Sequence, residues 1–379
     1  MVAISPSPRK RVLIVGCGFA GLAAARRFAR DGNRNLDLVV FNRTPTLYNY
    51  PILPRLLYET LPERLVSPRL EPLLAGLPLT LHTARIETVD LRAQCVTTQS
   101  QQFDYDYLIL ALGSRAVPLD KADDVFVCYP KAARHLARLR DIMRQQALAH
   151  DATPVRYVVA GGGLTGVEFA AALRELSCQV CAPLGQDPRH IAIELLERET
   201  RLLPGCHPAL GRRARRALSR EAIDVRTDCR VERVEAGRLF TSQGESPVDQ
   251  VLCCIGSQPD LRPELHGLAG DGAAIGVDAR LRIRGVENAY AVGDTIHFDD
   301  PVTPELKRAS HARDQGWWAA GNILRQIGES DPLPYRPGSK PTLLMLNPRN
   351  GILEYRGLCL GGRWVARLKR HLETRYCKR

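Results

Sequence analysis

The chain has 379 residues, 45% of them hydrophobic and 25% charged, and carries a formal net charge of +12 at pH 7. That length can hold two or three domains with a substantial core. No apolar run approaches the roughly 18 residues of a membrane-spanning helix. The N-terminal residues lack a separate apolar region with a cleavage site, so we expect no secretory signal. The 11 cysteines form no regular framework, which favours reduced thiols in an intracellular protein.

The positive charge is concentrated at the C-terminal end. Residues 361–379 contain seven basic side chains and one acidic side chain, Glu373, which gives this segment a net charge of +6 and half of the total. The remainder is spread thinly over the chain. This distribution argues against a broad nucleic-acid surface, and we expect no nucleic-acid partner.

The first predicted unit opens on a strand, a glycine-rich turn and a helix. Residues 11–15 are apolar, residues 16–21 read GCGFAG, and residues 22–30 form a small-residue helical stretch. In this context G-x-G-x-x-G is typical of a loop that holds a dinucleotide pyrophosphate on N–H groups at a helix N-terminus. A second strand at 36–41 ends at Asn42 and Arg43. Alternating segments at 79–110 predict a β-meander that leads into Gly113.

A second unit repeats this order 145 residues later. A helix at 131–150 and a linker at 151–154 precede a strand at 155–160, the loop GGGLTG at 161–166 and a helix at 167–176. The next strand, 191–196, ends at Glu197 and Arg198, and a strand at 249–255 runs into Gly256. This is an internal duplication of architecture. Two such loops predict two dinucleotides bound by one chain.

The remaining residues predict one more strand and two helices. The strand at 289–292 leads into Gly293 and Asp294, and a helix follows at about 307–326. After a glycine- and proline-punctuated stretch, large apolar side chains recur every four residues among basic ones, at Trp364, Leu368, Leu372 and Tyr376. Two interpretations remain open for this amphipathic helix at 361–379. It docks on the core of the protein, or it lies in a membrane surface with its arginine stems snorkelling.

The motifs together resemble a known superfamily. VGCGFAGLAAA, LILALGS, AGGGLTGVEFAAAL, CCIGSQPD and NAYAVGD follow one another as in the pyridine nucleotide-disulfide oxidoreductases. Within that superfamily the chain looks most like the single-subunit, non-pumping type II NADH:quinone oxidoreductases, and it is similar also to apoptosis-inducing-factor-like quinone reductases. The resemblance implies an α/β fold with two Rossmann-like domains, for FAD and NAD(P)H, with β-meanders as in glutathione reductase. The predicted segments are 1–120 and 259–335 for FAD, 121–258 for NAD(P)H, and a C-terminal segment at 336–379.

The resemblance also implies which residues bind the cofactors. Outside the loop and strand end of the second unit, those positions are Gly16, Gly18, Gly21, Asn42, Arg43, Gly113, Gly256, Gly293, Asp294 and Lys307. The first three would hold the pyrophosphate of FAD, and the Asp294 carboxylate would accept a hydrogen bond from the ribityl chain. Lys307 would favour an anionic reduced flavin, unless it is simply an exposed lysine. Asn42 departs from the acidic residue usual at its position, although its side chain can still hydrogen-bond a ribose.

In the second unit the resemblance implies that Gly161, Gly163 and Gly166 hold the pyrophosphate of NADH. Glu197 is suited to accept hydrogen bonds from the adenosine ribose and to repel a 2′-phosphate, which favours NADH. Arg198 beside it keeps NADPH as an alternative. Glu168, within the family pattern G-V-E-x-A, is the catalytic candidate, because the resemblance places it where nicotinamide stacks on the flavin. The alternative is a glutamate that merely suits the helix dipole.

The cysteines support other functions less well. Cys17 has no partner in a C-x4-C pair, so disulfide reduction is not expected, and Cys178 and Cys181 are interpreted as structural thiols. Cys128 lies close to where sulfide:quinone oxidoreductases hold a flavin-proximal cysteine, and Cys359 is the nearest candidate for the second one they need. Sulfide oxidation is therefore the runner-up. A binding flavoprotein resembling apoptosis-inducing factor, with the basic tail on nucleic acid, is a third hypothesis.

We predict an FAD-dependent NADH:quinone oxidoreductase in which hydride from NADH reaches flavin N5 and two electrons pass to a membrane quinone. The tail would attach the protein to the cytoplasmic, inner face of a membrane, in place of the long C-terminal membrane domain of many bacterial relatives. The quinone-proximal glutamine of many type II enzymes is replaced by Ser310 or a neighbour. No metal site is expected, and a homodimer is an open alternative.

Overall fold

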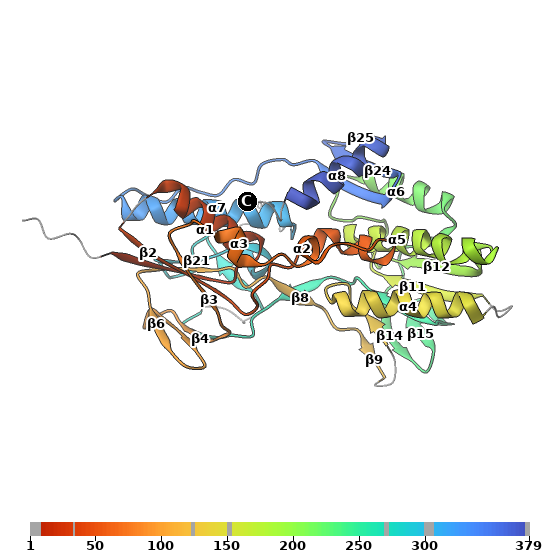
Figure 1. Cartoon of the computed structure of the whole chain (residues 1–379), viewed down its shortest axis with the longest axis horizontal. Helices are drawn as coiled ribbons and strands as arrows, with labels where there is room; N and C mark the ends of the chain where they lie inside the picture. Colours follow the sequence, from red (N-terminus) through yellow and green to blue (C-terminus); the bar gives the residue numbers. More distant parts are fainter. Residues whose placement is uncertain are drawn as a thin grey trace, which may run out of the picture.

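Two parallel sheets organise the chain, one in each half of an elongated molecule (Figure 1). The computed structural model describes residues 9–32, 35–122, 126–149, 154–268, 273–298 and 307–375. The first sheet has the order β21-β7-β1-β2-β3, formed by Ala289–Ala291, Tyr107–Leu110, Lys10–Val15, Leu36–Asn42 and Thr80–Thr83. The second has the order β10-β17-β11-β12-β13, formed by Val127–Cys128, Gln250–Cys253, Val155–Ala160, Ile191–Leu196 and Ile223–Arg226. The predicted α/β fold with two Rossmann-like units is confirmed.

Helices cover these sheets, which is why the central strands are nearly continuous apolar runs. On the first sheet α1 (Phe19–Asp31) and α7 (Ala309–Ile327) lie side by side (Figure 1). The second sheet is accompanied by α4 (Ala133–Ala149), α5 (Leu164–Cys181) and α6 (Pro208–Arg220). Short helical segments lie between the units or at strand ends. These are η1 (Tyr50–Leu57), α2 (Glu63–Val66), α3 (Leu70–Leu74), η2 (Ala182–Leu184), η3 (Pro188–His190) and η4 (Gly293–Thr295).

Smaller sheets complete both units. The first contains β4 (Ile86–Asp90), β5 (Cys95–Thr98) and β6 (Gln102–Asp104) with β19 (Glu264–His266), and also the pair β20 (Ile275–Val277) and β22 (Ile296–Phe298). The second contains β14 (Val231–Glu235), β15 (Arg238–Thr241) and β16 (Gly244–Pro247) with β9 (Asp120–Lys121), while β8 (Ser114–Ala116) pairs with β18 (Ser257–Pro259). The meander expected at 79–110 is shorter than predicted, because β3 and β7 join the parallel sheet instead.

The C-terminal segment differs from the sequence-based prediction. Residues 342–362 form an antiparallel sheet of β23 (Thr342–Asn347), β24 (Asn350–Tyr355) and β25 (Leu358–Gly362), which the glycine and proline pattern did not reveal. The helix, α8 (Arg363–Arg375), begins two residues later than predicted, because Gly361 and Gly362 pair with β24. Tyr376, Lys378 and Arg379 lie outside the described residues. The dark blue α8 lies beside β24 in Figure 1.

The close packing of α1 on α7 can be tested with two glycines of one helix. A Cβ added at Gly316 would overlap the carbonyl oxygen of Ala20, whereas a Cβ at Gly321 would meet only the Arg27 side chain at 3.8 Å. We expect Gly316→Ala to reduce the free energy of unfolding by about 1–3 kcal/mol, because α1 and α7 must separate. Gly321→Ala should be neutral or stabilising by up to about 1 kcal/mol. Denaturant unfolding measures both, and equal stability of the two variants would contradict the packing described.

Candidate functional site

A single cavity of about 970 Å³ extends along both nucleotide units. Its walls come from the first glycine loop, the end of β2, the beginning of α5, the segment before α7, and α8. Ten of the residues predicted from the sequence line it, namely Gly16, Gly18, Asn42, Arg43, Gly113, Glu168, Gly256, Gly293, Asp294 and Lys307. Gly21, Gly161, Gly163, Gly166 and Glu197 lie outside its lining. The structure thus brings most of the predicted FAD positions together with Glu168 of the second unit.

The first loop is closed by backbone contacts that only glycine permits. Gly16 has a φ of +97°, and a Cβ there would overlap the carbonyl oxygen of Ala111 at the end of β7. A Cβ at Gly21 would overlap the carbonyl oxygen of Gly16, so Gly21 holds α1 against the turn rather than facing the cavity. Gly18 is different, because a Cβ there would meet nothing within 4 Å. The space above Gly18, at the N-terminus of α1, is therefore free for a ligand.

Asn42 fastens this loop. Its Oδ1 accepts a hydrogen bond from the backbone N–H of Cys17 at 2.9 Å, and its Nδ2 donates to the carbonyl oxygen of Thr44 at 2.7 Å. The adjacent Arg43 donates to the buried Asp260 at 3.0 Å. These supporting contacts were not foreseen from the sequence, which considered Asn42 only as a partner for ribose.

The second loop repeats the geometry of the first. Gly161 has a φ of +103° and faces the carbonyl oxygen of Cys254, Gly166 packs on the carbonyl of Gly161, and the position above Gly163 is open. Asn42 ends β2, and Glu197 directly follows β12. Like Asn42, Glu197 accepts a hydrogen bond from the second residue of its loop, the N–H of Gly162, at 2.6 Å. The other oxygen of Glu197 accepts from the N–H of Glu199 at 2.9 Å.

Around Asp294 a chain of polar contacts connects the two units. The hydroxyl of Ser114 donates to Asp294 Oδ2 at 2.7 Å, and Lys131 Nζ donates to the same hydroxyl oxygen at 2.6 Å. Burial lowers the pKa of Lys131, which lines the cavity. Neither Ser114 nor Lys131 was predicted from the sequence as a site residue. Lys307 is exposed at the cavity rim, 3.4 Å from the carbonyl oxygen of Ser257.

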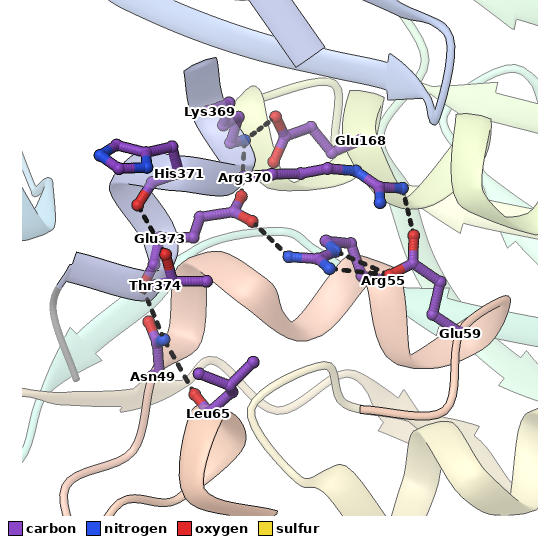
Figure 2. A network of polar contacts seen from close by, with 10 residues as sticks. All are labelled: Asn49, Arg55, Glu59, Leu65, Glu168, Lys369, Arg370, His371, Glu373 and Thr374. Atoms are coloured by element: carbon purple, nitrogen blue, oxygen red, sulfur yellow. Dashed lines mark hydrogen bonds and ion pairs between the residues drawn. The ribbon is translucent and has the colours of Figure 1, made fainter. Parts of the chain in front are cut away.

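Glu168 lies in the first turns of α5 and is buried at 8% exposure. Its Oε1 accepts hydrogen bonds from the backbone N–H of Met345 at 2.7 Å and from Lys369 Nζ of α8 (Figure 2). The C-terminal helix therefore docks on the protein. Its buried face carries Val365 and Ala366, whereas Trp364, the first residue of the apolar stripe noticed in the sequence, is 47% exposed. Leu368 and Leu372 of that stripe are half-buried, and Leu372 lines the cavity.

A network of buried charges holds α8 in this position (Figure 2). Glu373, at 1% exposure, accepts a hydrogen bond from Arg55 Nη1 of η1 at 3.2 Å, and Lys369 Nζ lies 3.8 Å from its other oxygen. Arg55 also donates to Glu59 at 2.8 Å, and Arg370 pairs with Glu59. Burial raises the pKa of Glu373 to about 7, opposed by Lys369 and assisted by the Glu168 carboxylate.

Comparison with known proteins places this site in a family. Residues 10–316 match the model of the family described as pyridine nucleotide-disulphide oxidoreductase. The chain belongs to this family. Among its similar relatives is "Type II NADH:quinone oxidoreductase NdhA" of Mycobacterium tuberculosis, 23% identical, with 96% of this chain and 83% of the relative covered. Another is "Demethylphylloquinone reductase NdbB" of Synechocystis sp., 27% identical, with 93% and 89% covered.

Solved structures of two kinds share the fold. "NDH2 from plasmodium falciparum in complex with NADH" superposes with a TM-score of 0.81 at 15% identity, covering 98% of both chains. The sulfide:quinone oxidoreductase from Aquifex aeolicus superposes with a TM-score of 0.79 at 20% identity, covering 97% of this chain and 90% of that one. At these identities the likeness establishes architecture.

The two cysteines of this oxidoreductase considered for sulfide oxidation do not lie where that reaction would need them, which is next to the flavin. Cys128 is fully buried outside the cavity lining, and burial raises the pKa of its thiol. Cys359 is also outside the lining, while Cys17, Cys253 and Cys254 contribute to it. The ten cysteines within the described residues are all free thiols. The pair considered from the sequence, Cys128 and Cys359, is therefore not brought to the cavity.

A lysine lies beside Ser310, the residue that stands where many type II enzymes have a glutamine near the quinone. Lys340 donates to the carbonyl oxygen of Ser310 at 3.0 Å and pairs with Asp314, and both Ser310 and Lys340 line the cavity. At the position where many type II enzymes have a glutamine, this chain therefore has Ser310 together with Lys340, a lysine from the segment that precedes β23. Neither Lys340 nor Lys369 stood out in the sequence, where they were two of many basic residues.

The elevated pKa of Glu373 predicts a pH dependence of stability. Because the folded-state value of about 7 lies above the ordinary 4.5, the contribution of Glu373 is complete below about pH 4.5 and is lost as pH rises through about 7. Relative to Glu373→Gln, the wild type should therefore lose thermal stability across this interval. Melting temperatures of both proteins at several pH values measure this. Glu59→Gln, which also removes a carboxylate partner of Arg55, is the control, and parallel curves for wild type and Glu373→Gln would contradict the assignment.

Proposed function

We propose that the chain is an FAD-dependent NADH:quinone oxidoreductase of the type II class. FAD held by the residues described below would supply the two-electron chemistry between NADH and a quinone. The observation that carries this proposal is the continuity of the cavity, which joins the first glycine loop to the beginning of α5 and to Lys369 of α8. A flavin ring held in this cavity would be accessible to nicotinamide from the second unit and to an electron acceptor from the side of α8. The relatives named as type II enzymes support the same activity.

The residues of the first unit fit an FAD. The amides of the loop around Gly18 point from the N-terminus of α1, where a pyrophosphate is favoured. Asp294 lines the cavity and suits a ribityl hydroxyl, although Ser114 already donates to it. Arg43 and Gly113 line the same wall. The bound flavin would supply the two-electron redox chemistry, while the protein supplies orientation and electrostatics.

The second unit fits NADH. Gly163 leaves open space at the N-terminus of α5, and Glu197 places a carboxylate beside the loop, which disfavours a 2′-phosphate. Arg198 is exposed and pairs with Glu199 at 3.1 Å, so NADPH remains the alternative nucleotide. Hydride transfer requires the reacting atoms to approach to roughly 3–3.5 Å. We assign Glu168, on the cavity wall of α5, the task of organising that approach.

The different tasks of the two loops can be tested by matched substitutions. A Cβ at Gly18, Gly163 or Gly205 meets nothing within 4 Å, so a side chain at any of these positions starts in open space. We expect Gly18→Val to be purified mostly without flavin. Gly163→Val should retain FAD but be reduced by NADH about 100-fold more slowly, because the nucleotide is displaced. Gly205→Val, outside both loops, should behave as wild type.

Anaerobic mixing with NADH and then with a short-chain ubiquinone, followed in the flavin spectrum, measures these reactions. A wild-type flavin that stays oxidised with NADH and is bleached by sulfide would contradict the proposal and favour sulfide oxidation. Normal reduction of Gly163→Val by NADH would contradict the assignment of the second loop.

We further propose that the C-terminal unit attaches the protein to the inner face of a membrane. Exposed large apolar side chains gather within ten residues, Tyr355 (38%), Leu358 (63%), Leu360 (44%) and Trp364 (47%), and Arg356, Arg363 and Arg367 beside them are exposed. Basic residues near an anionic leaflet contribute about 1 kcal/mol each. Among the described residues, no helix has the length and apolar character to cross a bilayer. The attachment proposed is peripheral, and the homodimer stays a prediction.

Vesicle flotation tests the attachment. We expect the triple change Leu358→Ser, Leu360→Ser and Trp364→Ser to abolish flotation with vesicles that contain phosphatidylglycerol, because the apolar anchors are lost. Reduction of the flavin by NADH should be unchanged. Leu148→Ser on α4, where the side chain is 69% exposed, is the control and should float as wild type does. Equal flotation of the triple variant and the wild type would contradict the proposed surface.

A further inference from the structure

One buried carboxyl group in the cavity wall has an oxygen without a hydrogen-bond partner. Glu373 is 1% exposed and lines the cavity, and its Oε2 accepts from Arg55. Its Oε1 has no hydrogen-bond partner among the described residues. Lys369 Nζ lies 3.8 Å from Oε1, beyond hydrogen-bond distance. Buried polar atoms are normally satisfied, so an unsatisfied carboxyl oxygen at a cavity wall points to a ligand or a proton.

The charges that face Glu373 come from three elements. They are Arg55 of η1, Glu168 of α5 and Lys369 of α8, with Glu59 and Arg370 one contact further away. Lys369 is shared between Glu168 and Glu373, and Arg55 is shared between Glu59 and Glu373. Each of the two cations beside Glu373 therefore also pairs with another carboxylate. Its carboxyl group can be neutral or charged at neutral pH, since its pKa is raised to about 7 by burial.

The proposed reaction needs a proton at this place. NADH gives up two electrons and one proton as hydride, whereas reduction of a quinone to a quinol takes two electrons and two protons. One proton per turnover must therefore come from the protein or from water. The wall that contains Glu373 also contains the apolar side chains of Leu372, Pro51 and Pro54, which suit a quinone ring.

We propose that neutral Glu373 donates this second proton to a quinone oxygen at the α8 end of the cavity. This inference rests on the proposed function. The O–H bond of the Glu373 carboxyl group breaks, and an O–H bond forms on the quinone, while both electrons come from NADH. Arg55 and Lys369 then stabilise the Glu373 carboxylate until it takes a proton from water. Glu168, whose Oε1 accepts from both Met345 and Lys369, positions the lysine.

The test follows the two half-reactions separately in the FAD-loaded protein. NADH reduction of the flavin should be the same in wild type, Glu373→Gln, Glu373→Asp and Glu59→Gln. Oxidation of the reduced protein by a short-chain ubiquinone should slow on the order of 100-fold in Glu373→Gln, since a general acid is lost. In wild type this rate should fall as pH rises through about 7. Glu373→Asp should keep a pH dependence, and Glu373→Gln should lose it.

Ferricyanide separates proton supply from a structural role, because it accepts electrons without protons. We expect Glu373→Gln to be oxidised by ferricyanide as fast as wild type. Glu59→Gln, which removes the other carboxylate partner of Arg55, should match wild type with both acceptors. A wild-type rate and pH profile with ubiquinone in Glu373→Gln would overturn the inference, and so would equal slowing with both acceptors. Wild-type protein that NADH cannot reduce, or that ubiquinone cannot reoxidise, would overturn the proposed function itself, before any variant is compared.

Discussion

The close approach of each glycine loop to the end of the neighbouring strand is the constraint on which the site depends. Gly16 rests against the carbonyl of Ala111, and Gly161 against that of Cys254. Each contact aims the N-terminus of the following helix past the carboxyl end of a parallel sheet, where ligands bind in open α/β folds. Because the chain repeats this contact, two such helix ends are presented by one molecule, and the cavity extends from the first loop to the beginning of the second helix.

The second constraint is the closure of that cavity by α8. Lys369, Arg370 and Arg55 alternate with Glu168, Glu59 and Glu373 across the contact between the tail and both units. Breaking a buried pair by removing one partner is typically destabilising by about 3–5 kcal/mol, since a charge is left uncompensated. The network therefore specifies one position for the helix, and three of its members, Glu168, Lys369 and Glu373, are also part of the cavity wall.

The sequence predicts those parts of the site that are encoded locally. Both loops, the strands around them and Glu168 at the start of α5 follow from patterns within short windows. The pairing of Glu168 with Lys369 cannot be predicted from the sequence, because 201 residues separate them and nothing local distinguishes this lysine from its basic neighbours. The apolar stripe of the tail does not reveal that Lys369 and Glu373 also face inward, as an ion pair one helical turn apart. No strand is predicted for residues 342–362 from the sequence, because glycines interrupt the strands, which pair at Gly351, Gly361 and Gly362.

The membrane contact that we propose and the closure of the cavity fall to two different faces of one short helix, α8. Val365, Lys369 and Glu373 face inward, while Arg363, Trp364 and Arg367 are exposed. A quinone arriving from a leaflet held by the outer face would meet the cavity where Leu372 and Glu373 form its wall. The proton donor we infer would then lie between the acceptor and the ion pairs that fix the helix. Because Lys369 contacts both Glu168 and Glu373, a change in the charge of either carboxyl group acts directly on the side chain that fastens the tail.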